Sequence, residues 1–216
     1  MVGPRRRVAD VGAGDGRLTC HLLKSGHVVT PTELSRAQAD RLRTILARTD
    51  VRVLEGYGFR PLRAQVFDLV IVAGVGGGTL ARILTDHAAR PSWPLLLQPM
   101  QNLGALLRAL RAVNRGVGCA RLVESRGRLY PVLDIPVNLP WNGSPPGLED
   151  DLGLFLQDDP LWPAWLDGVA RRRSRQLHHV SSSERAGRLE QELAAIRYMR
   201  AACVRRHPSQ LPKISR

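Results

Sequence analysis

Three glycines and an aspartate near the start of the chain have the spacing of a nucleotide-binding loop. The stretch "DVGAGDG" places Asp10, Gly12, Gly14 and Gly16 directly after a short apolar run and before an amphipathic one. A glycine-rich turn between a strand and a helix lets a ligand approach the backbone. A dinucleotide-binding loop would have its third glycine at Arg17, whereas D-x-G-x-G-x-G is the form common in enzymes that use S-adenosylmethionine. The spacing therefore predicts S-adenosylmethionine as the cofactor.

A carboxylate follows at the distance along the chain expected of a ribose-binding residue. Glu33 ends the next predicted strand, 17 residues after Gly16. At the end of a strand, a carboxylate can accept hydrogen bonds from both hydroxyl groups of a ribose. We therefore expect Glu33 to bind the ribose of the cofactor.

A second glycine-rich stretch stands where an α/β protein usually carries reactive side chains. The sequence "FDLVIVAGVGGGTL", residues 67–80, is a predicted buried strand that runs into Gly74, Gly76, Gly77 and Gly78. One interpretation is a plain strand-to-helix turn with close backbone packing. The other is a turn that leaves room for a substrate beside the cofactor.

The elements that would position these turns alternate along the chain. Short apolar runs and longer amphipathic runs follow each other as far as about residue 137, which predicts an α/β, Rossmann-like sheet with helices on both faces. Strands are predicted at residues 7–12, 27–34, 51–56, 67–74, 94–99, 120–125 and 129–138, and helices at residues 17–26, 35–49, 77–89 and 102–115. Only residues 126–128 join the last two strands, so we expect an antiparallel pair at the end of an otherwise parallel sheet.

The chain changes character after the last predicted strand. Residues 138–147, "NLPWNGSPPG", concentrate proline, glycine and asparagine without periodicity, which indicates a boundary. We divide the chain into a cofactor-binding domain at residues 1–138, a linker and connecting segment at 139–160, a helical hairpin at 161–206 and a tail at 207–216. The helices of the hairpin are predicted at about residues 160–180 and 183–206 and should pack as an antiparallel coiled coil.

The charge of the chain favours a polyanionic partner. The net charge is +13, and residues 160–216 hold 12 of the 32 lysines and arginines but 4 of the 19 acidic residues. Such an excess is typical of nucleic-acid-binding proteins. All but two of the basic residues are arginine, which a GC-rich genome would also produce without selection for RNA binding.

Other classes of site find little support in the sequence. Cys20, Cys119 and Cys203 are far apart and odd in number, which favours a reducing cytoplasm over a disulfide framework, and no metal site is expected. No apolar run approaches the roughly 18 residues of a membrane span, so we expect a cytoplasmic protein with no membrane contact. A monomer is the default, since no pattern predicts an oligomer.

Several segments together resemble one enzyme family. "VADVGAGDGRL", "PTEL", "VRVLEGYGF", "FDLVIVAGVGGGTLARIL", "LLLQPMQNLGALLRAL" and "LVESRGRLYPVL" precede a basic helical hairpin. This order resembles the bacterial tRNA (adenine-N1) methyltransferases that modify position 22 of tRNA, over roughly residues 7–204. The resemblance implies a class I Rossmann-like methyltransferase domain with a C-terminal coiled coil, S-adenosylmethionine as cofactor and tRNA as substrate.

The resemblance can be followed residue by residue. The chain has the family's residue at Asp10, Gly12, Leu18, Glu33, Gly56, Gly58, Ala73, Gly74, Gly76, Gly77, Gln98, Pro99 and Tyr130. It departs at Gly14 and Asp15, where the family usually has Asp-His, at Tyr57, where an acidic residue is expected, and at Met100, which replaces an asparagine. Asn102 could supply a nearby amide instead. Six residues precede Arg7, where the family has a helix.

The loop spacing and the resemblance together predict roles for these residues. The cofactor-binding set is Asp10, Gly12, Gly14, Gly16, Glu33, Tyr57, Ala73 and Gly74. The catalytic set is Gly74, Gly76, Gly77, Gln98, Asn102 and Tyr130. N1 of neutral adenine carries a lone pair and no proton, so its methylation needs alignment more than a general base. The glycines would form a floor for the base, an amide would hold its edge and Tyr130 would stack on it.

The RNA would be held by the helical hairpin. Its candidate phosphate contacts are Arg171, Arg172, Arg173, Arg175 and Arg197. A solvated helical face is the alternative explanation for any single arginine.

Two further hypotheses stay open at this point. The chain could be a class I methyltransferase that acts on another RNA or on a small molecule, with the arginine excess a product of genome composition. It could also be a non-catalytic RNA-binding relative that has lost cofactor binding, as the changes at Tyr57 and Met100 would allow.

Overall fold

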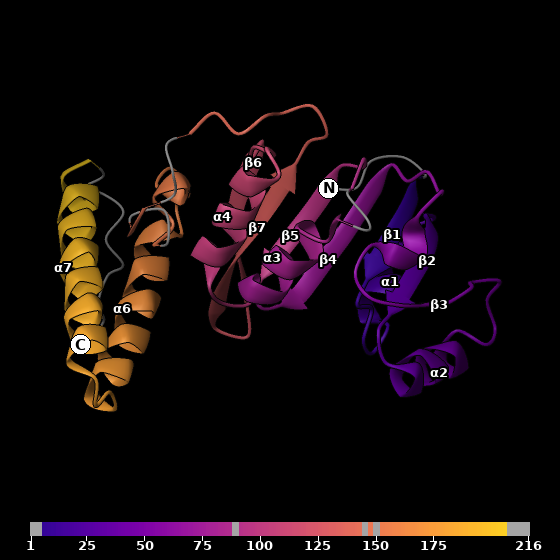
Figure 1. Ribbon diagram of the computed structural model, residues 1–216, viewed down its shortest axis with the longest axis horizontal. Helices are drawn as coiled ribbons and strands as arrows, with labels where there is room; N and C mark the ends of the chain where they lie inside the picture. Colours follow the sequence, from indigo (N-terminus) through magenta and orange to yellow (C-terminus); the bar gives the residue numbers. More distant parts are fainter. Residues whose placement is uncertain (1–5, 88–90, 144–146, 149–151, 207–216) are drawn as a thin grey trace.

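The computed structural model describes residues 6–87, 91–143, 147–148 and 152–206 (Figure 1). The strands are β1 (Arg7–Val11), β2 (Val28–Glu33), β3 (Leu54–Glu55), β4 (Leu69–Val75), β5 (Leu95–Pro99), β6 (Cys119–Ser125) and β7 (Arg128–Ile135). The helices are α1 (Arg17–Lys24), α2 (Arg36–Ile45), α3 (Gly77–Leu84), α4 (Leu103–Ala112), α6 (Trp162–His178) and α7 (Ser183–Arg206), with the 3-10 turns η1 (Arg60–Leu62) and η3 (Leu154–Leu156).

The seven strands form one Rossmann-like sheet, as predicted. Their order is β3-β2-β1-β4-β5-β7-β6. The strands β1 to β5 are parallel to one another, whereas β7 is antiparallel to both β5 and β6. The chain reverses from β6 to β7 with Ser125 paired to Arg128, which confirms the expected terminal hairpin.

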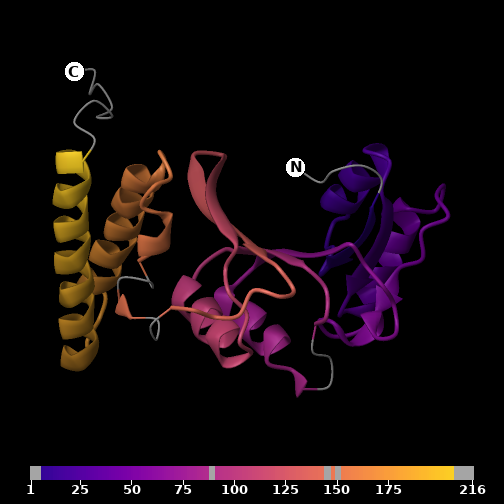
Figure 2. The same cartoon turned by 90° about the horizontal axis from the view of Figure 1, so that it is seen from above.

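Helices cover the two faces of the sheet unequally. Leu80 of α3 and Leu106 of α4 are fully buried in the same core as Val72 and Leu97 of the central strands. Figure 2 shows these two helices, coloured magenta to pink, on one side of the sheet. On the opposite face, Leu22 of α1 packs in a separate core against residues of β1, β2 and β4. Alternating side chains of the strands supply the two cores, as the pleat of a buried sheet requires.

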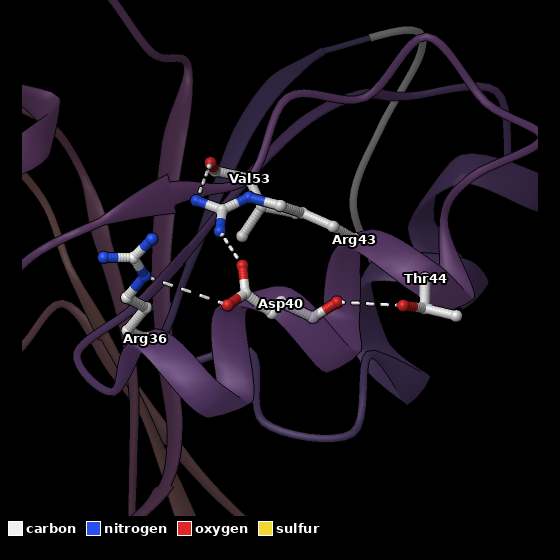
Figure 3. A network of polar contacts seen from close by, with 5 residues as sticks. All are labelled: Arg36, Asp40, Arg43, Thr44 and Val53. Atoms are coloured by element: carbon white, nitrogen blue, oxygen red, sulfur yellow. Dashed lines mark hydrogen bonds and ion pairs between the residues drawn. The ribbon is translucent and has the colours of Figure 1, made fainter.

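The helix α2 covers the end of the sheet that carries β3. Its Leu42 is buried, and polar contacts flank it on the surface (Figure 3). Asp40 forms ion pairs with Arg36 and Arg43, and Arg43 also donates a hydrogen bond of 3.4 Å to the carbonyl oxygen of Val53. Exposed ion pairs contribute little to stability. The contact with Val53 instead joins α2 to the segment that leads into β3.

Several elements end earlier than their sequence predicted, among them α4, which ends at Ala112 instead of residue 115, and β7, which ends at Ile135 instead of residue 138. The strand β3 has only two residues instead of six, because it lies at the edge of the sheet and pairs only with Thr32 and Glu33 at the end of β2. The helix α2 ends at Ile45 instead of residue 49, because the backbone N–H groups of Ala47 and Thr49 bond to carbonyls three residues earlier, in turns, instead of four residues earlier. The helix α3 ends at Leu84 instead of residue 89, and residues 88–90 lie outside the described part.

The two C-terminal helices pack against each other as the predicted hairpin. Leu189, Leu193 and Ile196 of α7 are buried in their interface. Arg200 of α7 donates two hydrogen bonds of 2.8 Å to the two carboxylate oxygens of Asp167 on α6. A bidentate pair of this kind fixes the register of the helices as well as their distance.

The helical hairpin is attached to the β6 edge of the sheet, as Figure 1 shows. Asp159 accepts a hydrogen bond of 2.8 Å from the backbone N–H of Leu122 in β6, and the indole of Trp162 donates one of 2.8 Å to the carbonyl of Gly153. The core of the sheet continues without a break to Trp162 and Leu166 of α6. The division at residues 138, 160 and 206 stays a prediction, and the tail at 207–216 lies outside the described residues.

A buried arginine holds the base of the sheet together. The side chain of Arg115, which follows α4, donates hydrogen bonds of 3.0–3.1 Å to four backbone carbonyls. The acceptors belong to Pro91 and Trp93 before β5 and to Ile135 and Pro136 at the end of β7. Burial lowers the pKa of the Arg115 guanidinium. The carbonyl cage replaces the water that this cation loses.

We expect Arg115→Met to lower the free energy of unfolding by about 2–4 kcal/mol, because it leaves four carbonyl groups without their donor. Urea denaturation measures the change. The control is Arg111→Met at an exposed position of α4, which should cost less than about 0.5 kcal/mol. Equal denaturation midpoints for the two variants would show that the cage does not stabilise the fold.

Candidate active site at the carboxyl ends of the parallel strands

The loop after β1 is open at two of its glycines. Gly12, Gly14 and Gly16 all have positive φ angles, of 74°, 55° and 75°. A methyl group at Gly12 would touch no atom within 4 Å, and one at Gly14 would meet only a carbonyl oxygen at 3.9 Å. At Gly16 it would lie 2.6 Å from the side chain of Leu42. Gly12 and Gly14 therefore border open space, whereas Gly16 lets α1 begin close to α2.

Glu33 ties this loop to the end of β2. Its carboxylate is buried, with 7% of the residue exposed, and accepts hydrogen bonds of 2.9 Å from the backbone N–H groups of Gly14 and Leu34. Each oxygen uses one of its lone pairs in these bonds and keeps another for a ligand. Both oxygens are thus held at fixed positions beside the open glycines.

Asp10 lies below the loop and supports it. The residue is 3% exposed, and its carboxylate accepts a hydrogen bond of 2.6 Å from the hydroxyl of Thr19 in α1. Burial raises the pKa of the Asp10 carboxyl, hydrogen bonds from Thr19 partly offset this, and the nearby charge of Glu33 raises it further. Asp10 therefore joins β1 to α1, and its predicted contact with the cofactor stays a prediction.

The end of β4 contains a bulge at Gly74. Ala73 pairs with Gln98 and Val75 pairs with Pro99, so Gly74 is an extra residue, with a φ angle of 77°. The side-chain oxygen of Gln98 accepts a hydrogen bond of 2.9 Å from the N–H of Gly74. A bulge leaves a backbone group unpaired, and this bond satisfies it. Gln98 therefore positions Gly74, which is exposed and has open space on its Cα.

The remaining glycines of this turn differ in role. Gly77 is buried, donates its N–H to the carbonyl of Gln101 at 2.8 Å, and would place a methyl group 2.0 Å from the carbonyl oxygen of Asn102. Close packing between the turns after β4 and β5 thus explains this glycine. Gly76 has no contact nearer than 3.9 Å at the same position, and Asn102 is exposed at the start of α4.

The two tyrosines lie on opposite sides of the open turns. Tyr57, in the loop after β3, is partly buried, and the guanidinium of Arg60 lies 5.8 Å from its ring centre. Tyr130 is in β7, where it pairs with Val123 of β6, three residues before Leu133, at which the pairing with β5 begins. The structure therefore places Tyr130 in the β6–β7 hairpin, on the carboxyl side of the pairing between β5 and β7, and Tyr57 just after the carboxyl end of β3.

The candidate RNA-binding arginines fall into two groups. Arg171, Arg172, Arg175 and Arg197 are exposed. Arg173 instead forms an ion pair with Glu192, which is buried in the interface of α6 and α7. The charge of Arg173 is therefore neutralised within the helical hairpin by Glu192.

Sequence reasoning missed two supporting residues. Thr32 accepts hydrogen bonds of 3.0 Å at its carbonyl from the N–H groups of Gly12 and Ala13, which fixes the loop after β1. Leu34 is an apolar side chain with 61% exposure directly after Glu33. An exposed leucine beside a buried carboxylate can pack on the flat face of a nucleoside. The sequence carried this signal as the apolar residue that follows Glu33.

The described residues fit a nucleoside cofactor. Gly12, Gly14 and Gly74 leave open space at the ends of β1 and β4, and Glu33 offers two fixed oxygens next to them. In the described part of the chain, no group of three histidine, cysteine or acidic side chains could hold a metal ion. Among the same residues, no helix combines the length and the apolar character that a membrane span requires.

Comparison with known proteins gives one matching family. A family model described as a methyltransferase domain matches residues 1–133. None of the curated proteins matches the sequence.

Solved structures share the fold over nearly the whole chain. Streptococcus pneumoniae Sp1610 in complex with S-adenosyl-L-methionine has a TM-score of 0.75 at 19% identity, over 93% of this chain and 94% of that chain. The B. subtilis M1A22 tRNA methyltransferase TrmK has a TM-score of 0.73 at 14% identity, over 90% and 92%. M. capricolum TrmK in complex with S-adenosyl-homocysteine has a TM-score of 0.71 at 14% identity, over 92% and 93%. At such identities the likeness concerns the fold, including the helical hairpin.

We expect Glu33→Ala to weaken the binding of S-adenosylmethionine by about 1–3 kcal/mol, or about 5- to 150-fold, because the substitution removes two fixed acceptors. Calorimetric titration measures the affinity, and thermal unfolding shows whether the variant is folded. Glu190→Ala, at an exposed position of α7, is the control. Wild-type affinity in a folded Glu33→Ala variant would remove Glu33 from the cofactor site.

Proposed function

The chain belongs to the methyltransferase-domain family, and on that premise we propose that it methylates N1 of an adenine in tRNA, at position 22. The fold is that of S-adenosylmethionine-dependent methyltransferases, with a Rossmann-like sheet and an antiparallel terminal strand. Membership of the family does not determine which base or which RNA is methylated. The residues around the open turns support this part of the proposal.

The observation that carries the proposal is the absence of titratable side chains from the two turns that border the substrate space. Residues 73–80 after β4 read AGVGGGTL and residues 98–104 after β5 read QPMQNLG, and all of them lie in the described part of the chain. A nucleophile that must lose a proton before attack needs a general base within hydrogen-bond reach. N1 of adenine needs none, because its lone pair lies free in the plane of the ring.

The residues of the chain then have defined tasks. S-adenosylmethionine supplies an electrophilic methyl group when bound. Glu33 and the loop with Gly12 and Gly14 hold its ribose, and Leu34 covers one face of its adenine. Gln98 keeps the bulge at Gly74 in place, so that the edge of the target base can approach without meeting a side chain. Transfer to N1 would form the N1–methyl bond as the bond between that methyl group and the sulfonium breaks. The positive charge would pass from sulfur to the base, and S-adenosylhomocysteine would be the second product.

The substrate RNA fits the remaining features. N1 lies on the Watson–Crick edge, so the base must be unpaired or rotated out of a helix before it reaches the turn. Tyr130, in the β6–β7 hairpin on the carboxyl side of the β5 pairing, can stack on such a base. The exposed arginines of α6 offer contacts for phosphates. Two of the structures that share the fold are named TrmK, one of them an M1A22 tRNA methyltransferase, which supports tRNA as the substrate class.

The test is methyl transfer from S-adenosylmethionine to unmodified bacterial tRNA, followed by nuclease digestion and mass spectrometry of the nucleosides. We expect 1-methyladenosine, and a stop of reverse transcription at position 22, because a methyl group at N1 blocks base pairing. Reactions with Glu33→Ala serve as the control. Methylation of another atom or another nucleoside, or no transfer to tRNA, would contradict the proposal.

A further inference from the structure

The turn between β6 and β7 lies at the same edge of the sheet as the open glycines. The strand β7 is antiparallel to β5, so its first residue, Arg128, is found at the carboxyl ends of the parallel strands. Arg126 and Gly127 form the turn itself, between the paired residues Ser125 and Arg128. Figure 2 shows this hairpin projecting from the sheet, with α6 beside it.

Arg126 has a conformation that arginine rarely adopts. Its φ angle is 52° and that of Gly127 is 69°, as in a two-residue hairpin turn with both residues left-handed. The first position of such a turn favours asparagine, aspartate or glycine. An arginine is therefore a poorer choice for folding, which indicates that its side chain serves another purpose.

The helix α6, which carries several arginines, contacts β7, the strand that follows this turn. Arg172 places its guanidinium 5.5 Å from the ring centre of Trp165. Arg172 is exposed as a residue, but partial burial of its guanidinium lowers its pKa, and the positive charges of neighbouring arginines, Arg128 among them, lower the pKa further. Charges from two segments more than 40 residues apart in sequence thus interact at one place.

These positive charges have no acidic partners within the described residues. We use the name turn–helix arginine cluster for Arg126, Arg128, Arg171, Arg172 and Arg175. None of the five forms an ion pair with a described carboxylate. By contrast, Arg173 and Arg200 of the same helical hairpin pair with Glu192 and Asp167. Uncompensated like charges destabilise a folded chain unless an anion binds between them.

The cluster continues on both sides. Toward the glycine turn, Tyr130 and Val132 follow Arg128 at alternate positions of β7, so they share its face of the sheet. Arg121 is exposed and pairs with Val132 on that face. Toward the closed end of the helical hairpin, a hollow of about 310 Å³ is lined by Arg175, Gln176, His179, Val180 and Arg185.

We propose that the turn–helix arginine cluster binds the phosphate backbone of the substrate RNA and so presents the target base to Gly74. This inference rests on the proposed function and names the surface that serves it. Arginine suits the task because its planar fork binds two phosphate oxygens at once. The RNA then lies across both the sheet and the helical hairpin, with Tyr130 between the phosphate contacts and the reacting base.

The sharpest test is Arg126→Asn. Asparagine fits the left-handed turn better than arginine, so the melting temperature should stay the same or rise. The affinity for tRNA should nevertheless fall, and it should fall about 10-fold in the double variant that also carries Arg128→Gln. The slope of log affinity against log salt should decrease by about one for each phosphate that the variant no longer neutralises. Affinity for S-adenosylmethionine should not change. Arg172→Gln, checked for folding by its melting temperature, should lower tRNA affinity in the same way.

The matched control is Arg41→Gln, which removes one exposed charge from α2 at the far end of the sheet. If Arg41→Gln lowered tRNA affinity as much as the cluster variants do, the loss would come from net charge alone. That result would overturn the inference. Wild-type affinity and salt slope in Arg126→Asn with Arg128→Gln would overturn it as well. An equal decrease of affinity for duplex DNA would make the cluster a general polyanion surface, again against the inference. Weaker tRNA binding without any formation of 1-methyladenosine by the wild type would support the surface and contradict the proposed reaction.

Discussion

The candidate site depends on hydrogen bonds that tie the backbone of each open turn to the neighbouring strand. Glu33 of β2 holds the N–H of Gly14 after β1, and Gln98 of β5 holds the N–H of Gly74 in β4. These N–H groups are hydrogen-bonded to side chains of the neighbouring strands. No other part of the protein therefore has to cover the outer surface of either turn to satisfy them. The site is therefore built from backbone, with side chains that support it from below and from the flanks.

The sequence predicts this site in part, because some of its features are local. The glycine spacing and the position of Glu33 at a strand end follow from residues close to each other in the chain. The bulge at Gly74 does not, since it depends on the register between β4 and β5. The same holds for Gly77, whose need for glycine comes from the carbonyl of Asn102, 25 residues later. From the sequence, Gly77 is grouped with the glycines that would face the base. In the structure, close packing against the carbonyl of Asn102 explains why this position needs a glycine.

The arginines show the same division between local and distant information. Composition predicts a basic helical hairpin but does not separate Arg173, whose charge is paired with buried Glu192, from Arg172, which lies among other arginines. It also gives no sign that Arg115 is buried among carbonyl groups. The groups around each arginine thus decide its role: Arg173 stabilises a helix interface, Arg115 holds the base of the sheet, and Arg172 belongs to the surface proposed to bind RNA.

In the proposed reaction the chain aligns its substrate without a general base. The measurement that tests this directly is the single-turnover rate of methyl transfer to saturating tRNA as a function of pH. We predict a constant rate from about pH 6 to 9, because neither N1 of adenine nor the turns after β4 and β5 carry a group that titrates there. A rate that follows one or two protein pKa values near neutrality would contradict this mechanism, since a side chain of the chain would then have to gain or lose a proton in the reaction.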